Sequence, residues 1–290
     1  MKPAAFVYRA PASLPEALAQ LREFGGDARV IAGGQTLVPA MSMRLARPAA
    51  LIDLNGVAEL AFLRAGADAI EIGAMTRQRT LERSAEIGRH ARLFHLALPH
   101  VAHFQIRNRG TFGGSLCHND PAAELPAVAA ALSAEFVIAG ASGDRTVGAD
   151  GFFAGLLSTA LEPDEILRAI RIPYLPGSCG FGFAEVARRH GDFALAGAAA
   201  VLRLGGDGTL DLARLVLFGV DDGPVRAHAA EAAMLGERPS DDLWSAAAAA
   251  AVAGISPVAD LHASALYRRE VAETLARRVL RQAAAELRDG

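Results

Sequence analysis

Two glycine pairs, Gly33-Gly34 and Gly113-Gly114, carry the clearest chemical signal in this chain. Each pair is followed within two residues by a hydroxyl side chain, Thr36 after the first and Ser115 after the second. Glycine lets the backbone turn sharply and lets a ligand approach closely. Exposed backbone N–H groups beside a hydroxyl suit phosphate oxygens, above all at the start of a helix. Two such loops in one chain predict a ligand that carries a diphosphate.

The sequence around the two loops indicates that the phosphate is bound and is not transferred. Neither loop has the spacing GxGxxG or GxxxxGK[ST]. Lys2 is the only lysine of the chain, so neither loop has the lysine that phosphoryl transfer places on the transferred group. These features together favour a nucleotide cofactor.

Other polar residues give weaker signals. His100 and His103 lie three residues apart but lack an obvious third ligand, so we interpret them as ordinary helix histidines rather than zinc ligands. We expect Arg107 and Arg109 to lie on a solvated surface rather than to contact a phosphate. The segment His118-Asn119-Asp120 fits either an Asx turn or a cofactor contact, and the sequence leaves both interpretations open.

The composition excludes several classes of protein. The formal net charge of −3 gives no electrostatic reason to expect nucleic acid. The apolar run at 246–255 is too short to cross a bilayer, and the N-terminus lacks the apolar core of a secretory signal. We therefore expect a cytoplasmic protein. Cys117 and Cys179 form no CxxC, so any iron–sulfur centre would belong to another chain, and we expect both to be small buried thiols.

The elements around the first glycine pair form a short alternating pattern. Apolar spacing predicts a helix at 14–24 with Ser13 as its N-cap, followed by a strand at 28–32 that runs into the loop. Thr36 is expected to cap a short helix that reaches residue 44. A strand at 51–54 would complete a small βαβ-like unit.

The remaining pattern predicts an α+β chain whose order of elements changes after residue 180, where strands come first and helices follow. In the middle we expect strands at 70–74, 135–139 and 166–172 and helices at 80–89, 93–101 and 121–132. Residues 173–180 hold two prolines and two glycines and are expected to form a linker. Beyond it we expect strands at 181–186, 194–204 and 210–220, a tight hairpin at 205–208, and helices at 225–235, 243–253 and 262–287.

The glycine segments resemble the motifs of a known family. The segment 32–36, AGGQT, resembles the first flavin-binding motif of the FAD-binding subunits of molybdenum hydroxylases, and 111–115, TFGGS, resembles the second. The family includes the carbon monoxide dehydrogenase medium subunit and the FAD domain of xanthine dehydrogenase. The resemblance runs the whole length, through segments at 106–109, 119–121, 152–155, 164–167, 191–194 and 263–269.

The resemblance implies three parts and a set of cofactor contacts. Residues 1–56 would form an α/β piece and 57–175 an α+β piece that hold FAD between them, and 176–290 an antiparallel sheet with a helical bundle. No catalytic residue and no metal ligand is expected on this chain. The implied FAD contacts are Val30, Ile31, Ala32, Gly33, Gly34, Gln35, Thr36 and Leu37 around the diphosphate and flavin, Thr111, Gly113, Gly114 and Ser115 through backbone and hydroxyl groups, the acidic Glu124, the apolar Val101 and Leu167, and Phe193 near the flavin ring.

Three of these positions depart from the family pattern. Relatives often have Ser at the position of Thr36 and Asn at Ser115, and both replacements keep a polar contact. Relatives such as the carbon monoxide dehydrogenase medium subunit have Tyr at the position of Phe193. Because Phe lacks the hydroxyl, the sequence leaves open how this position affects the flavin potential or the access of the electron acceptor.

The resemblance implies an electron-transfer subunit within a larger enzyme. Electrons would pass from a molybdenum–pterin centre on a large partner, through 2Fe–2S clusters on a small partner, to FAD on this chain and then to an external acceptor. A dimer of heterotrimers is the implied assembly. A free-standing FAD oxidoreductase and an adaptor without cofactor are the alternatives. The substrate and the acceptor stay open, since the substrate site would lie on another subunit.

Overall fold

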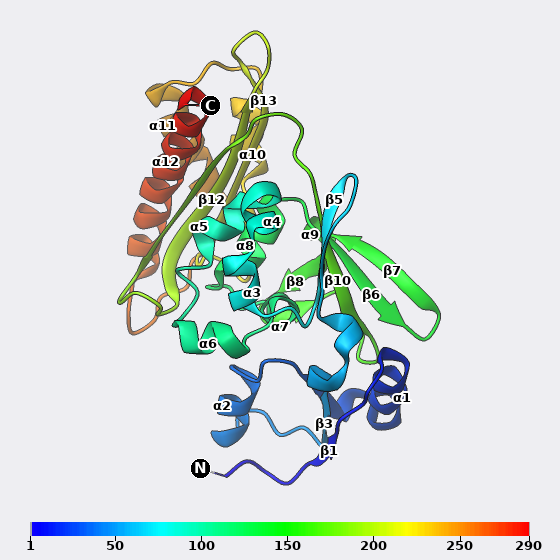
Figure 1. Ribbon diagram of the computed structural model, residues 1–290. Helices are drawn as coiled ribbons and strands as arrows, with labels where there is room; N and C mark the ends of the chain where they lie inside the picture. Colours follow the sequence, from blue (N-terminus) through cyan, green and yellow to red (C-terminus); the bar gives the residue numbers. More distant parts are fainter. Residues whose placement is uncertain (1, 290) are drawn as a thin grey trace.

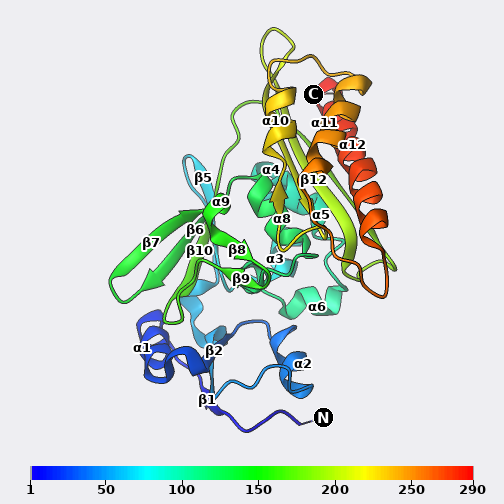
Figure 2. The same cartoon turned by 180° about the vertical axis from the view of Figure 1, so that it is seen from behind.

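The computed structural model describes residues 2–289, so the terminal residues of the expected ranges 1–56 and 176–290 lie outside it. Three main sheets follow one another along this part of the chain (Figures 1 and 2). Both views place the small N-terminal unit at one end of the molecule and the long C-terminal helices at the other. The expected α+β class is confirmed.

The N-terminal unit is a three-stranded parallel sheet with strand order β1-β3-β2. Its elements are β1 (Val7–Arg9), α1 (Leu14–Phe24), β2 (Ala28–Ile31), α2 (Leu37–Ser42) and β3 (Ala50–Asp53). Because β2 and β3 pair in parallel across α2, the predicted βαβ-like unit is confirmed. Ser13 caps α1 by accepting a hydrogen bond from the Glu16 N–H, as predicted.

The predicted cap of α2 is wrong. The Thr36 side chain makes no capping hydrogen bond, and the helix ends at Ser42 rather than at residue 44. The reason is the backbone of Thr36, whose φ of −107° and ψ of −49° are helical, whereas a capping residue has an extended conformation. Three short 3₁₀ turns complete this region and the connection to the middle of the chain: Gly25–Asp27, Leu54–Gly56 and Ala58–Leu60.

The middle sheet is antiparallel, with strand order β4-β5-β10-β6-β7. Its strands are β4 (Leu63–Ala65), β5 (Ala69–Gly73), β6 (Glu135–Gly140), β7 (Gly143–Gly148) and β10 (Ile166–Pro173). The accompanying elements are α3 (Gln78–Arg83), α4 (Ala85–His90), α5 (Arg92–Ala97), α6 (Phe104–Arg109), α7 (Phe112–His118), α8 (Glu124–Ala131), α9 (Ala149–Phe152), β8 (Phe153–Gly155) and β9 (Ser158–Thr159).

The predicted helices of this region needed four corrections. The smallest is that the helix expected at 121–132 begins at Glu124. The helix expected at 80–89 is two helices, because Ser84 leaves the helical conformation after α3 and then caps α4 by accepting from the Ile87 N–H. The helix expected at 93–101 ends at Ala97, so His100 and His103 lie in the connection to α6 rather than on a helix. Helices α6 and α7 were not predicted. Strand β7 was not predicted either, since its residues are largely exposed and carry no apolar alternation.

The C-terminal sheet is also antiparallel, in the order β11-β12-β13-β14. Its strands are β11 (Gly180–Ala187), β12 (Ala194–Leu204), β13 (Leu210–Phe218) and β14 (Val225–Arg226), and α10 (His228–Met234), α11 (Asp241–Ala253) and α12 (Ala265–Asp289) follow. The predicted hairpin is confirmed, since Leu204 pairs with Leu210 across the turn. A side chain at Gly180 or Gly182 would overlap carbonyl oxygens of α12, so this helix lies directly on β11.

Two predicted C-terminal helices begin later than expected. The first residues of the helix expected at 225–235 form β14 instead. The last helix begins at Ala265 rather than 262, because Asp260 accepts hydrogen bonds from the N–H groups of His262 and Ala263 and closes a turn there. Ser264 then accepts from the Tyr267 N–H as the helix starts.

One hydrophobic core joins the middle sheet to the C-terminal sheet. It holds residues of β5, α5, α8 and β6 together with Phe183, Val201 and Phe218 from the C-terminal strands. The rings of Phe183 and Phe218 stack with their centroids 5.8 Å apart. A second core lies between the C-terminal sheet and helices α10 to α12, and a third lies in the N-terminal unit. The packing therefore fixes the middle and C-terminal sheets against each other.

Candidate cofactor site

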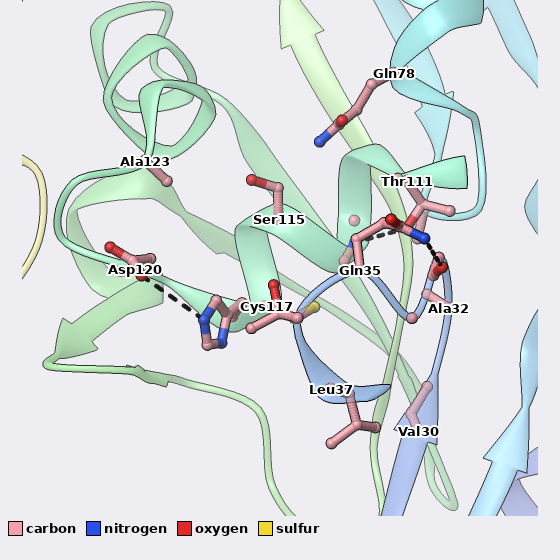
Figure 3. A pocket seen from close by; sticks show the side chains of 18 of the residues that line it. Val30, Ala32, Gln35, Leu37, Gln78, Thr111, Ser115, Cys117, Asp120 and Ala123 are labelled. Carbon is pink, nitrogen blue, oxygen red and sulfur yellow. Dashed lines mark hydrogen bonds and ion pairs between the residues drawn. The ribbon is translucent and has the colours of Figure 1, made fainter. Parts of the chain in front are cut away.

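A cavity of about 590 Å³ lies between the two glycine segments. Its volume falls within the range of about 300–1,000 Å³ that is usual for ligand and cofactor pockets. Figure 3 shows Ala32 and Gln35 of the first segment and Thr111 and Ser115 of the second around it. The residues expected at the site that line this cavity are Val30, Ala32, Gly33, Gly34, Gln35, Thr36, Leu37, Val101, Thr111, Gly113, Gly114, Ser115, Glu124, Leu167 and Phe193. Ile31 alone of the expected set is not among the lining residues, and its side chain lies beneath Gly34.

The first glycine segment lines the cavity and holds free backbone donors. The N–H groups of residues 33–37 have no hydrogen-bond acceptor within residues 2–289. Gly34 has a φ of +72°, a backbone conformation that glycine adopts without strain. The segment leads directly into α2, whose N-terminus adds partial positive charge. Free N–H groups at such a turn are the arrangement that binds phosphate oxygens.

The second glycine segment differs from the prediction, which was a loop with exposed N–H groups. It forms the first turn of α7, and the N–H groups of Phe112 to Ser115 already donate within the chain. Phe112 donates to the Thr76 carbonyl and Gly113 to the Ala74 carbonyl, both at 2.8 Å, and Gly114 donates to Thr111 Oγ1 at 3.0 Å. What this segment offers to a ligand is therefore the hydroxyl groups of Thr111 and Ser115, since the N–H groups of Phe112 to Ser115 are already paired.

The two segments touch each other through their backbones. A Cβ at Gly33 would overlap the carbonyl oxygen of Arg109 and would lie 2.8 Å from Gly110 Cα. A Cβ at Gly114 would lie 3.5 Å from the Cβ of Ala32. Glycine is required at Gly33 because the backbone before the second segment occupies the space of a side chain.

Arg77 and Asn55 hold this contact together, and sequence reasoning missed both. The Arg77 guanidinium donates to the Arg109 carbonyl and to Asn55 Oδ1, the latter at 2.7 Å. Asn55 Nδ2 in turn donates to the Ala32 carbonyl at 2.8 Å. Burial and then the charge of Arg109 lower the pKa of Arg77. This clamp (Arg77 and Asn55) links the carbonyl of Ala32 to the carbonyl of Arg109. No local pattern marks its members, because they lie far apart in the sequence.

Arg107 is buried, so its expected place on a solvated surface is wrong. It is 7 % exposed and forms a two-pronged pair with Glu82 at 3.0 and 3.1 Å. Its Nη1 donates to the carbonyls of Val101 and Ala102 at 2.7 and 2.9 Å. Arg107 thereby fixes the segment that brings Val101 to the cavity. Arg109, in contrast, is exposed as expected.

Both interpretations of the segment 118–120 find support. Asp120 Oδ1 accepts from the Ala122 N–H at 2.9 Å, which makes the Asx turn. Asn119 has a φ of +46° and donates to the carbonyls of Gly155 and Ser158, so its role is structural. His118 and Asp120 also line the cavity.

The thiol and carboxyl groups of the cavity are electrostatically unusual. Burial raises the pKa of the Cys117 thiol to about 12. Cys117 and Cys179 are both only partly buried, whereas the sequence predicted buried thiols. Glu124 is 5 % exposed, and burial followed by the charge of Glu185 raises its pKa to about 8. No group of three or more His, Cys, Asp or Glu side chains suited to a metal ion occurs in the part of the chain that the structure describes.

The fold and the paired glycine segments define the class of this protein. Residues 4–175 match the family described as the FAD binding domain in molybdopterin dehydrogenase, and residues 181–283 match the CO dehydrogenase flavoprotein C-terminal domain. The chain belongs to the FAD-binding medium subunits of the molybdenum hydroxylase family. The family resemblance and the expectation of FAD are thereby confirmed.

Three relatives illustrate this membership. The chain is 39 % identical, over 98 % of its length and 96 % of the relative's, to the 6-hydroxypseudooxynicotine dehydrogenase complex subunit alpha of Paenarthrobacter nicotinovorans. It is 43 % identical to the caffeine dehydrogenase subunit beta of Pseudomonas sp. strain CBB1, over 84 % of this chain and 82 % of the relative. Its fold matches a carbon monoxide dehydrogenase structure from Hydrogenophaga pseudoflava with a TM-score of 0.96, 40 % identity and 99 % coverage of both chains. Its relatives are thus subunits of dehydrogenases, as expected. No helix between residues 2 and 289 has the length and apolarity needed to cross a membrane.

Proposed function

We propose that this chain is the FAD-carrying electron-transfer subunit of a molybdenum-dependent hydroxylase or dehydrogenase. One observation carries the proposal: residues 33–37, whose N–H groups have no acceptor among residues 2–289, line the same cavity as Thr111 and Ser115 with their hydroxyl groups. These groups fit the anionic diphosphate of FAD, because they supply hydrogen-bond donors at a helix N-terminus. The absence of a lysine fits a diphosphate that is bound and not transferred. When bound, FAD supplies redox chemistry that no side chain of the cavity provides.

The remaining lining residues take roles that follow from their chemistry. We propose that FAD lies between the parts 1–56 and 57–175, with its diphosphate at Gly33 to Thr36. Val101 and Leu167 supply apolar surface for the flavin, since both are buried at the cavity wall. Phe193 is 63 % exposed at the cavity lining, so it can cover the flavin without occupying the core.

Partner subunits supply the electrons. We propose a small subunit with 2Fe–2S clusters and a large subunit with a molybdenum–pterin centre, assembled as a dimer of heterotrimers in the cytoplasm. The relatives support this proposal, since their names describe subunits of dehydrogenases, one of them a dehydrogenase complex. The two cysteines of this chain also cannot supply the four ligands of a cluster. Because the named relatives act on a nicotine derivative, caffeine and carbon monoxide, the flavin subunit does not determine the substrate.

Purification of the complex from its natural host tests the proposal. We expect a flavin absorption spectrum, with FAD released on denaturation and copurification of a subunit with cysteine-rich cluster motifs. A well-folded, colourless chain without affinity for FAD would refute the proposal. Anaerobic reduction of the isolated chain by a small substrate would favour a free-standing oxidoreductase. Replacement of Gly114 by a bulky residue should abolish flavin retention; an adaptor would keep its partners and show no flavin in either form.

A further inference from the structure

A buried amide side chain lines the cavity without a hydrogen-bond partner for its oxygen. Gln78, the first residue of α3, is 5 % exposed and belongs to the cavity wall. Its Oε1 atom is buried and has no partner within residues 2–289. Figure 3 shows the amide nitrogen directed into the cavity, on the side of Thr111 and Ser115, with no interaction drawn to it. The amide is therefore free to contact a ligand.

Contacts with the second glycine segment fix the place of this amide. Gln78 donates its backbone N–H to the Gly110 carbonyl at 3.0 Å, and Arg77 pairs with Thr111 as an isolated antiparallel bridge. A Cβ at Gly110 would lie 2.6 Å from Gln78 Oε1 and 3.0 Å from its Cδ, so the amide packs directly against Gly110. Gly110 Cα is also the atom that a Cβ at Gly33 would approach to 2.8 Å. The amide therefore lies next to the contact between the two glycine segments.

Gln78 does not suit a role in stability. A buried amide whose oxygen lacks a partner is costly, and an apolar side chain of similar length would fill the same place at lower cost. Among the buried side-chain atoms without a partner in residues 2–289, Gln78 Oε1 is the only one on a residue that lines the cavity. Gln20 of α1 differs, because its Oε1 also lacks a partner but its Nε2 donates to Glu16 at 3.0 Å. The role of Gln78 therefore lies toward the cavity.

We propose that Gln78 is a binding residue for FAD, whose amide nitrogen donates to a hydrogen-bond acceptor of the cofactor. The proposal rests on the proposed function, in which FAD occupies the cavity. An amide nitrogen carries two N–H donors and no charge, so it fits a carbonyl oxygen or ring nitrogen of the flavin or adenine as well as a phosphate oxygen. Gln78 would thus add a side-chain contact, from outside both glycine segments, to those of residues 33–37, Thr111 and Ser115.

The experiment compares the wild-type complex, from which FAD has been removed, with its Gln78→Met variant. Methionine has a length close to that of glutamine and carries no N–H donor. Gln20→Met is the matched control, because it also removes an amide with an unpaired Oε1, at a place that does not line the cavity. The readouts are the dissociation constant of FAD and the thermal unfolding midpoint of the FAD-free complex. FMN and ADP are titrated separately, as probes of the flavin half and the adenosine half.

We expect different effects on binding and on stability. Gln78→Met raises the dissociation constant of FAD by about 10-fold, the size of one lost hydrogen bond to an acceptor that stays buried. The unfolding midpoint of the FAD-free complex stays the same or rises, because the unpaired amide is gone. Weaker binding of FMN alone identifies a flavin acceptor, and weaker binding of ADP alone identifies an adenosine acceptor. An equal loss for both identifies a phosphate oxygen. Gln20→Met keeps the wild-type affinity for FAD.

Two results would overturn the role of Gln78. One is wild-type affinity for FAD, FMN and ADP in a folded Gln78→Met complex. The other is a lower unfolding midpoint of the FAD-free variant together with weaker binding, which would make Gln78 a structural residue.

A second variant covers the case in which Gln78→Met does not fold. Gln78→Asn keeps the amide but withdraws it from the cavity by one methylene group. Wild-type affinity for FAD in Gln78→Asn would overturn the contact, and weaker affinity with an unchanged unfolding midpoint would support it. Failure of the wild-type complex to bind FAD is a separate result, because it would refute the proposed function itself.

Discussion

The backbone contact between the two glycine segments predicts that Gly33→Ala weakens FAD binding. The added methyl would overlap the carbonyl oxygen of Arg109 and lie 2.8 Å from Gly110 Cα. Neither atom belongs to a side chain that can rotate away, so one backbone segment must shift. An extra methyl in a closely packed site costs about 1–3 kcal/mol. If the binding free energy of FAD is weakened by about 2 kcal/mol because the loop shifts, the dissociation constant of FAD rises by about 30-fold.

Equilibrium titration of the FAD-free complex with FAD, together with thermal unfolding, measures this effect. We expect the midpoint of unfolding to fall by about 4–8 °C for a loss of about 2 kcal/mol. Gly26→Ala is the matched control, because a Cβ at Gly26 has no atom within 4 Å and its φ is not positive. Gly26→Ala should leave both quantities within error of the wild type. If Gly33→Ala binds FAD as tightly as Gly26→Ala does, the reasoning from the contact is refuted.

Three further predictions follow from the clamp, the acid and the thiol. Arg77→Met removes the hydrogen bonds to Asn55 and Arg109. It should lower the free energy of unfolding by about 2 kcal/mol, measured by urea titration, and weaken FAD binding, measured by FAD titration. Glu124 has its pKa raised from 4.5 to about 8, so its contribution to stability is complete below pH 4.5 and is lost as the pH rises through 8. Glu124→Gln should therefore flatten the fall in stability over that window. Because burial raises the pKa of Cys117 to about 12, iodoacetamide should label it slowly at pH 8 in the native chain and rapidly in urea, by mass spectrometry.

Each of these predictions can fail in a definite way. Unchanged FAD affinity and stability in Arg77→Met would mean that the clamp does not position the glycine segments. Parallel stability curves of the wild type and Glu124→Gln across the pH window would mean that Glu124 ionises normally. Rapid labelling of Cys117 in the native chain would mean that the thiol is open to solvent.

The sequence allowed prediction of those parts of the fold whose signals are local. Strand β12 was predicted with its observed bounds, because an apolar run is enclosed by turn residues. The cap at Ser13 and the parallel pairing of β2 with β3 follow from a helical apolar face flanked by short apolar strands. The glycine segments were predicted as site residues from their own composition and from the family resemblance, and the fold brings them to one cavity.

The parts that were not predicted depend on contacts between distant residues. Helix α7 begins in a Gly-Gly sequence that favours a loop, yet a Cβ at Gly113 would meet Ala74, so the packing requires glycine inside a helix there. The clamp joins Arg77 to Asn55 and Arg109, and no pattern within one segment indicates such a pair. Arg107 belongs with Glu82 for the same reason, and its burial cannot be recognised from neighbouring residues.

The core shared by the middle and C-terminal sheets has a consequence for how this chain can be divided. The family descriptions change between residues 175 and 181, whereas Phe136 of the middle sheet and Phe218 of the C-terminal sheet belong to one core. A fragment that stops at residue 175 would leave its half of that core in water, and a fragment that starts at 181 would do the same. The two parts are therefore expected to fold together, and neither one is expected to be soluble when expressed without the other.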